Sequence, residues 1–392
     1  MKTLRILTTV HLANPGACIF IEALTKALQT TLPDYDVRVL DYLPLKWYFY
    51  ELARAFRPNS KQPFLNLQRY IKSEKFHHDS LLLDNSIFTM PNSYDGMVRF
   101  LSRQSYDALV VGMVVWDIVN KSFIPRFPNI YWLSDDIPAK KIAYAASGHR
   151  TDFNLFRQHL PEIRRSLNSF SLIGVRDNIT YQMIQEAGLE THIPVIRVPD
   201  PAFLCDSDSP KIQELLEEAG VDLTKPIVGF MFYGNDVISK RLAKHFHAMD
   251  YQIVSLSMYN PYADINLAHL LSPHEWASIF PMMVFCITDR FHGTVMCLKS
   301  KTPFISIEPY KPLTPENSKI QSLLKDFDSL DLFMDEYAED FSFDQFLEKI
   351  RFISQHWDKT YKPRIEKKLA SVYATHHDFQ QKIALLLGEG KE

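Results

Sequence analysis

An arginine, a histidine and a glycine stand close together at residues 290–293, between two apolar runs. The run before them has the composition of a buried strand, and the residues after them have the apolar spacing of a helix. Such a turn lies at the carboxyl end of a sheet, where open α/β folds place ligands and helix N–H groups favour anions. We therefore predict an anion site at Arg290, Gly293 and Thr294, with His292 as its titratable, catalytic group.

A second arginine follows another expected strand. Arg176 comes directly after the apolar run 171–175, and Asp177 is placed to cap a helix over residues 178–187. The Arg176 guanidinium could bind a carboxylate or phosphate bidentately, or pair with a neighbouring acid. Both alternatives stay open from the sequence.

Two further turns carry candidate residues. Glu308 ends the apolar run 304–307 and could orient His292, bind sugar hydroxyls, act as an acid or be a solvated strand end. The loop after the first expected strand holds Asn14 and a single glycine, Gly16. It is either a weak phosphate cradle or a tight turn that starts a helix.

Metal and serine-nucleophile chemistry find little support. Neighbouring histidines on a helix point to different sides, and no carboxylate cluster accompanies them at ligand spacing. No GxSxG elbow occurs. We predict no metal site and interpret as solvated the pairs His77–His78, His376–His377 and His245–His247.

The composition is that of a globular protein. Of 392 residues, 46% are hydrophobic and 23% charged, and the formal net charge of −3 gives no basic excess for nucleic-acid binding. The four cysteines form no CxxC pair, which indicates reduced, buried thiols and a cytoplasmic protein. We expect no cleavable signal and no transmembrane segment, although peripheral membrane contact stays open.

Alternating strand and helix patterns predict an α/β fold of two Rossmann-like domains that face a cleft. We expect the first domain at 1–204, a linker at 205–225, the second domain at 226–355 and a C-terminal helix over 356–392 that packs back. Residues 42–95 are interpreted as an insertion. Its aromatic cluster at 42–50 could stack on sugars, but such residues more often fill cores or interfaces.

Several of these segments together resemble the polysaccharide pyruvyl transferase family. They occur in the family order over about residues 5 to 325. The matching segments are Asn14–Ala17, Val110–Trp116, Ala143–Gly148, Gly174–Asp177, Val198–Phe203, Thr288–Gly293 and Pro303–Ile307.

The resemblance implies a fold similar to GT-B glycosyltransferases. It also implies transfer of the pyruvyl unit of phosphoenolpyruvate to two hydroxyls of a sugar, which forms a ketal and releases phosphate. The acceptor would belong to a cell-surface polysaccharide or its precursor, either free or carried on a lipid. Phosphoenolpyruvate would be the donor substrate, with no bound cofactor.

That chemistry assigns roles to the candidate residues. The donor must be protonated at its methylene carbon, and its carboxylate and phosphate need cationic or N–H partners. His292 would be the general acid or a phosphate contact, while Arg290 and Arg176 would bind the anionic groups. Glu308 would place His292 or the acceptor. On the side of the first domain, the acceptor would meet Asp117 and the Gly16 loop.

Two other function classes fit the same sequence. A metal-independent glycosyltransferase could use a nucleotide sugar in the same cleft, because a fold does not fix a function. A carbohydrate-binding protein could keep the scaffold without catalysis. The oligomeric state stays open.

Overall fold

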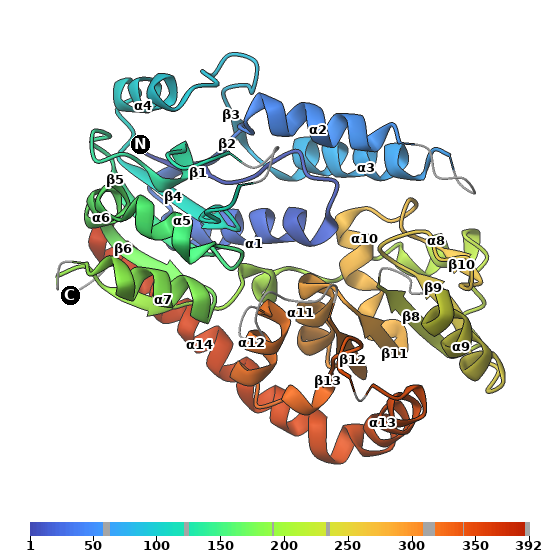
Figure 1. Cartoon of the computed structure of the whole chain (residues 1–392). Helices are drawn as coiled ribbons and strands as arrows, with labels where there is room; N and C mark the ends of the chain where they lie inside the picture. Colours follow the sequence, from blue (N-terminus) through green and yellow to red (C-terminus); the bar gives the residue numbers. More distant parts are fainter. Residues whose placement is uncertain are drawn as a thin grey trace.

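A computed structural model describes residues 1–57, 63–120, 125–189, 192–232, 236–308, 318–339 and 341–388. Two parallel sheets lie side by side, the first among the blue-to-green elements of Figure 1 and the second among the yellow-to-orange ones. The prediction of an α/β protein with two Rossmann-like domains is confirmed. Residues 58–62 of the predicted insertion and 389–392 of the predicted C-terminal segment lie outside the described residues.

The first sheet has the strand order β3-β2-β1-β4-β5-β6-β7. It consists of β1 (Lys2–Leu7), β2 (Tyr35–Leu40), β3 (Leu83–Asp84), β4 (Ala108–Met113), β5 (Lys140–Ala146), β6 (Phe170–Val175) and β7 (Val195–Arg197). Its helices are α1 (Pro15–Thr31), α2 (Leu45–Ala55), α3 (Leu65–Ser80), α4 (Tyr94–Arg103), α5 (Phe153–Gln158), α6 (Leu160–Asn168) and α7 (Asn178–Ala187). Short 3-10 turns are η1 (Ile130–Trp132) and η2 (Pro201–Leu204).

The second sheet repeats the pattern with the order β10-β9-β8-β11-β12-β13. It consists of β8 (Ile227–Met231), β9 (Gln252–Ser255), β10 (Ile265–Asn266), β11 (Met283–Thr288), β12 (Phe304–Ile307) and β13 (Phe333–Met334). Its helices are α8 (Ile212–Glu218), α9 (Asp236–His247), α10 (Pro273–Ser278), α11 (Phe291–Ser300), α12 (Lys319–Asp326) and α13 (Phe343–His356), with 3-10 turns η3 (Phe280–Met282) and η5 (Leu330–Leu332). A π-helix, η6 (Trp357–Tyr361), leads into α14 (Lys362–Leu387).

In both sheets, the strand order reverses at the first strand of the domain, which lies in the middle of the sheet. In the first sheet, β2 and β4 flank β1, and in the second β9 and β11 flank β8. Crevices at the carboxyl ends of such switch points are the usual ligand sites of open α/β sheets. We therefore expect the ligand-binding residues in the loops after β1, β4, β8 and β11.

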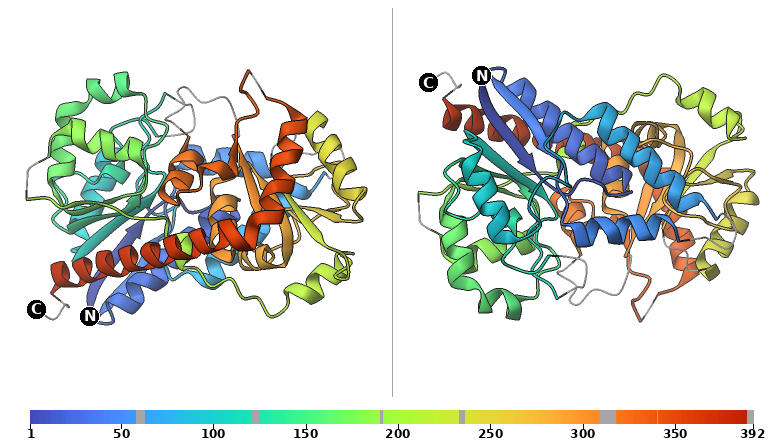
Figure 2. Two further views of the ribbon diagram at one scale, coloured as in Figure 1. Left: turned by 90° about the horizontal axis from the view of Figure 1, so that it is seen from below. Right: turned by 90° about the horizontal axis from the view of Figure 1, so that it is seen from above.

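Helix α14 joins the cores of the two domains. Ile365, Leu369 and Val372 belong to the core of the second domain, whereas Phe379 and Ile383 pack with α1 on one face of the first sheet. Figure 2 shows α14 in dark red crossing from the second domain to the first, where it ends beside the N-terminus. No helix among the described residues has the length and apolar character needed to cross a bilayer.

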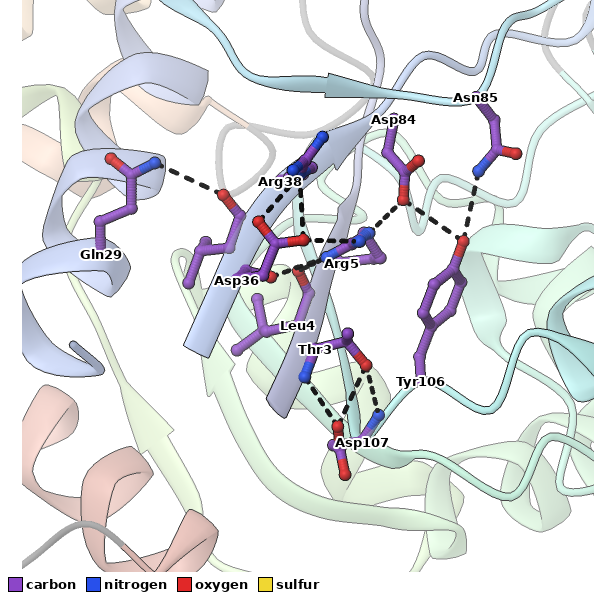
Figure 3. Close-up of polar contacts among 11 residues, drawn as sticks. Thr3, Leu4, Arg5, Gln29, Asp36, Arg38, Asp84, Asn85, Tyr106 and Asp107 are labelled. Carbon is purple, nitrogen blue, oxygen red and sulfur yellow. Dashed lines mark hydrogen bonds and ion pairs between the residues drawn. The ribbon is translucent and has the colours of Figure 1, made fainter. Parts of the chain in front are cut away.

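The segment 42–95 differs from the predicted insertion. Its described part holds two helices and β3, which is the edge strand of the first sheet. Figure 3 shows Arg5 of β1 between Asp36 of β2 and Asp84 of β3. The Arg5 Nη2 donates to Asp36 Oδ2 at 3.0 Å and its Nε donates to Asp84, so the buried guanidinium ties three strands together. This part of the segment is integral to the sheet.

Two of the histidines predicted to be solvated are buried instead. His77 lies against Cys18, with 3.4 Å between Nε2 and Sγ, and His376 Nδ1 lies 3.0 Å from the Tyr144 hydroxyl. Each sits on a helix face that packs against another element, while its neighbour in sequence, His78 or His377, is exposed. The four cysteines are buried free thiols, as predicted.

The contact of α14 with the first sheet gives a test of its role in stability. Phe379 is 1% exposed, its ring lies 4.9 Å from that of Tyr144, and a Cβ at Gly174 would approach it to 2.6 Å. We expect Phe379→Ala to lower the free energy of unfolding by about 3–5 kcal/mol, because the vacated site cannot collapse. Leu385→Ala, at a position 51% exposed on the same helix, should change it by about 0.5 kcal/mol or less. Equal losses in urea titrations of the two variants would contradict this packing.

Candidate active site between the two sheets

Two adjoining cavities, of about 380 and 310 Å³, lie where the two switch points face each other. We call them together the central cavity. Most residues that line the larger cavity belong to the second domain, including Arg290 and Gly293. The second cavity is lined by Trp47, Glu51 and Arg176 of the first domain. Both cavities are lined by Ala13, Asn14, Arg54, Arg150, Phe291, His292 and Lys319.

The central cavity is strongly basic in a chain with a net charge of −3. Two carboxylates, Glu51 and Asp289, line it. Six cationic side chains oppose them: Arg54, Arg69, Arg150, Arg176, Arg290 and Lys319. Helices α1, α11 and α12 also begin at its wall, and the N-termini of such helices favour negative charge. The arrangement suits a ligand with more than one anionic group.

The turn after β11 lies between a strand and a helix, as the sequence predicts. Asp289 to Gly293 all line the cavity, and α11 begins within this turn. The Arg290 Nε lies 2.8 Å from Asp289 Oδ1, which holds the guanidinium at the wall. A Cβ at Gly293 would approach Thr288 Oγ1 to 2.4 Å, so glycine lets the helix start close to the strand end.

Arg176 and His292 meet at one buried carboxylate, Asp200, on the segment that connects the domains. Arg176 Nη1 donates to Asp200 Oδ2 at 2.5 Å, and His292 Nε2 lies 3.6 Å from the same oxygen. Burial raises the pKa of Asp200, but His292 and Arg176 outweigh it and hold this pKa well below its usual range. Burial lowers the pKa of His292, and Asp200 opposes this shift without cancelling it.

The loop after β1 approaches the second domain closely. The Asn14 side chain accepts a hydrogen bond from Gly16 N at 3.1 Å and so caps α1. A Cβ at Gly16 would lie 2.3 Å from His292 Cβ. Gly16 therefore admits the histidine, and Asn14 serves the helix start while it also lines the cavity.

Asp117 acts through a neighbour. It is 4% exposed, and its Oδ2 accepts from Arg150 Nε at 2.6 Å while Oδ1 accepts from Arg150 N at 3.0 Å. Arg150 lines both cavities and Asp117 lines neither. The structure thus places Asp117 behind an arginine that sequence reasoning missed.

Lys319 is another cavity residue that sequence reasoning missed. It starts α12 and lines both cavities, and its Nζ lies 5.4 Å from the centre of the Phe291 ring. Burial, together with Arg176 and Arg150, lowers the pKa of Lys319 to about 7. Lys319 thus lies in a buried and basic environment, where an anionic ligand would favour its charged form.

Glu308 and Thr294 lie outside the lining of the central cavity. Burial raises the pKa of Glu308 to about 7, and a hydrogen bond from Ser318, the residue before α12, opposes the shift. Among the described residues no contact joins Glu308 to His292, whose carboxylate neighbour is Asp200. The Thr294 hydroxyl lies 3.1 Å from Arg290 O and 2.8 Å from Ser306 Oγ, so it packs α11 on the sheet.

The sequence also matches known proteins. A family model described as polysaccharide pyruvyl transferase matches residues 14–310, which include the turn at 289–293. The chain belongs to the polysaccharide pyruvyl transferase family. No curated protein shows significant sequence similarity to it.

Solved structures similar to this family member confirm the expected GT-B-like fold. A putative UDP-N-acetylglucosamine 2-epimerase from Listeria monocytogenes has a TM-score of 0.55 at 10% identity, covering 100% of this chain and 98% of its own. Phytolacca americana UGT2, complexed with UDP-2fluoro-glucose and pterostilbene, has 0.54 at 10% identity, covering 99% and 100%. A glycosyltransferase from Rickettsia africae has 0.53 at 11% identity, covering 98% and 99%.

The loop that leads to Asn14 is fastened by an ion-pair network in this pyruvyl transferase family member. His11 Nδ1 lies 2.8 Å from Glu74 Oε2 of α3, and Nε2 lies 2.7 Å from Asp41 Oδ1. Burial lowers the pKa of His11, but the two carboxylates outweigh it and raise this pKa to about 9. The imidazolium therefore holds the loop against α3, whose Arg69 lines the cavity.

This network predicts a loss of stability at alkaline pH. A pKa raised from about 6.5 to about 9 contributes about 3 kcal/mol, which is fully present below pH 6.5 and is lost as the pH rises through 9. His11→Asn removes the titration, and asparagine tolerates the φ of 62° found here. We expect Tm of the variant to lie below that of the wild type at pH 6.5 and to converge with it near pH 9.5. Parallel curves of Tm against pH would show that His11 is not charged.

Proposed function

We propose that this protein transfers the pyruvyl unit of phosphoenolpyruvate to two hydroxyls of a sugar in a cell-surface polysaccharide or its precursor. The observation that carries the proposal is the central cavity, which six cationic side chains line together with His292 in a chain of a pyruvyl transferase family. Phosphoenolpyruvate carries a phosphate and a carboxylate on three carbons. Its two closely spaced anionic groups match this lining better than a neutral sugar would.

The proposed reaction balances with the groups at hand. A proton adds to the methylene carbon of the donor, which leaves positive charge on the carbon that bears the phosphate. One acceptor hydroxyl bonds to that carbon, and the second displaces phosphate, which leaves with the electron pair of its C–O bond. Of the two hydroxyl protons, one replaces the proton given to the methylene and the other leaves with phosphate. The products are a cyclic ketal and inorganic phosphate.

We assign the proton donation to His292. Burial lowers the pKa of His292, and a bound anion beside the ring favours the imidazolium, so that donor binding promotes the protonated form of the acid. Arg290, Arg176 and Lys319 bind the anionic groups and stabilise the leaving phosphate. Glu308 acts as a positioning residue through Ser318, which caps α12 directly before Lys319.

The second candidate function is a nucleotide-sugar glycosyltransferase. The observation in its favour is the GT-B-like fold, shared with a plant protein that binds a UDP-sugar analogue. The fold supports both chemistries. Mass spectrometry of a panel of glycosides incubated with phosphoenolpyruvate tests the proposal directly. A pyruvyl ketal adduct supports it, whereas glycosyl transfer from a UDP-sugar, or sugar binding without any adduct, would favour the alternatives.

The assignment of His292 predicts a selective loss of chemistry. We expect His292→Gln to lower the rate of phosphate release by about 10²- to 10⁴-fold, because the proton to the methylene then lacks a positioned donor. Binding of phosphoenolpyruvate should persist, since the cationic side chains remain. His78→Gln, on an exposed position of α3, serves as the control. Near wild-type turnover of His292→Gln would remove this residue from the mechanism.

The lowered pKa of Lys319 predicts that the protein takes up a proton from the buffer when the donor binds. An anion raises the pKa of Lys319 from about 7, so binding at pH 8 should take up as much as about one proton. Calorimetry in buffers of different ionisation enthalpy measures this uptake. Lys319→Arg keeps the positive charge but cannot titrate, and it should bind the donor with much less uptake. Equal uptake by both proteins would contradict the role of Lys319.

A further inference from the structure

The end of the central cavity that faces α2 differs chemically from the rest. Here Trp47 and Glu51 line the wall, four residues apart and therefore on one face of the helix. Both are buried, with 8% and 6% of their surface exposed. The other cavity is lined by Arg69 and Arg290 instead.

Glu51 makes the wall beside α2 a poor place for the anionic groups of the donor, although Arg176 of the same cavity attracts such groups. Its carboxylate lies on the wall of the second cavity, and a phosphate or carboxylate placed beside it would be repelled. The Arg54 Nη1 donates to Glu51 Oε1 at 3.2 Å. Burial raises the pKa of Glu51, while Arg54, a hydrogen bond from Trp47 and the charge of Arg69 oppose the shift. A carboxylate held there suits neutral hydroxyl donors.

Trp47 offers the complementary apolar surface. Its indole packs on Leu43 and Ile87, which fix it, and both Trp47 and Val114 line the second cavity. Rigid aromatic rings with one polar group are well suited to the mixed surface of a sugar ring, which presents C–H groups on its faces and hydroxyls at its edge. His292 lines both cavities and therefore lies between the two ends.

We propose that Trp47 and Glu51 form the acceptor subsite, where a hexopyranosyl unit packs against the indole and presents a pair of hydroxyls to the carboxylate. The inference rests on the proposed function. Glu51 accepts the proton of the attacking hydroxyl while the oxygen bonds to the phosphate-bearing carbon of the donor. Before this step, His292 has donated a proton to the methylene carbon, which is bonded to the phosphate-bearing carbon. The second hydroxyl then bonds to the same carbon as the C–O bond to phosphate breaks, and phosphate leaves with the electron pair of that bond and takes up the proton of this hydroxyl.

The experiment separates acceptor binding from proton transfer. Acceptor and donor KM and kcat are measured with the p-nitrophenyl glycosides of glucose, galactose, mannose and their N-acetylated 2-amino forms. Trp47→Leu should raise acceptor KM by about five- to tenfold, since the aromatic contact is lost. Glu51→Gln keeps the hydrogen-bonding shape but not the base, so kcat should fall by about 100-fold or more. Donor KM should stay within about twofold in both variants.

A matched control lies on the same helix. Phe49 is 55% exposed, and Phe49→Leu should leave all constants unchanged. Stabilisation by phosphoenolpyruvate in thermal melts reports whether each variant is folded with an intact donor site. If Trp47→Leu and Glu51→Gln match the wild type toward the glycosides, the acceptor subsite lies elsewhere and this inference is wrong. If wild-type protein shows neither donor stabilisation nor any adduct, the proposed function itself fails.

A direct binding measurement keeps the inference testable for a slow enzyme. Saturation-transfer NMR on wild-type protein with bound phosphoenolpyruvate should show contact with at least one glycoside, and Trp47→Leu should weaken that signal. Glycoside contact that is unchanged in Trp47→Leu would overturn the subsite, as would the absence of contact with every glycoside in the presence of a bound donor.

Discussion

The buried carboxylate of Asp200 is the interaction on which the site depends. It is fully shielded from solvent at the side chain, it accepts from Arg176 of the first domain, and it lies 3.6 Å from His292 of the second. A buried charge is stable only with partners, and removal of one partner is costly. Because the partners come from different domains, the charge balance of the site and the closeness of the two sheets are coupled. Gly16 contributes to this coupling sterically, because the absence of a side chain at this position lets His292 pack against the start of α1.

A second constraint is the excess of positive charge around that point. Asp200 neutralises only part of it, and burial, together with Arg176 and Arg150, lowers the pKa of Lys319 to about 7. The whole chain is slightly acidic, so this basic character is local and belongs to the cavity. A site of this kind binds an anion in order to relieve repulsion as well as to gain hydrogen bonds. Family membership and electrostatics thus point to the same class of donor.

The sequence predicted the fold well because strands covered on both faces are nearly continuous apolar runs, bounded by clear turns. It predicted Arg176, Arg290 and His292 at the cavity for a related reason, since residues that follow strands of a parallel sheet share one edge. It could not give distances across that edge. For this reason the sequence suggests Glu308 as a partner of His292. In the structure the carboxylate beside His292 is that of Asp200, although Asp200 follows no long strand.

Other residues were missed because their surroundings are set by tertiary packing. Lys319 follows a polar segment with no apolar pattern, and Glu51 lies in an aromatic cluster that reads as core. His77 and His376 were interpreted as solvated, since periodicity gives the face of a helix but not which element covers it. Interactions within an element are visible in sequence, and interactions between elements are not.

The central claim is that the cavity between the two sheets holds phosphoenolpyruvate. A crystal structure of the protein soaked with this compound tests it most directly. The account predicts density for the donor beside His292, with its phosphate and carboxylate in contact with Arg290, Arg176 or Lys319. Density for the compound at another place, or an empty cavity at saturating concentration, would contradict it.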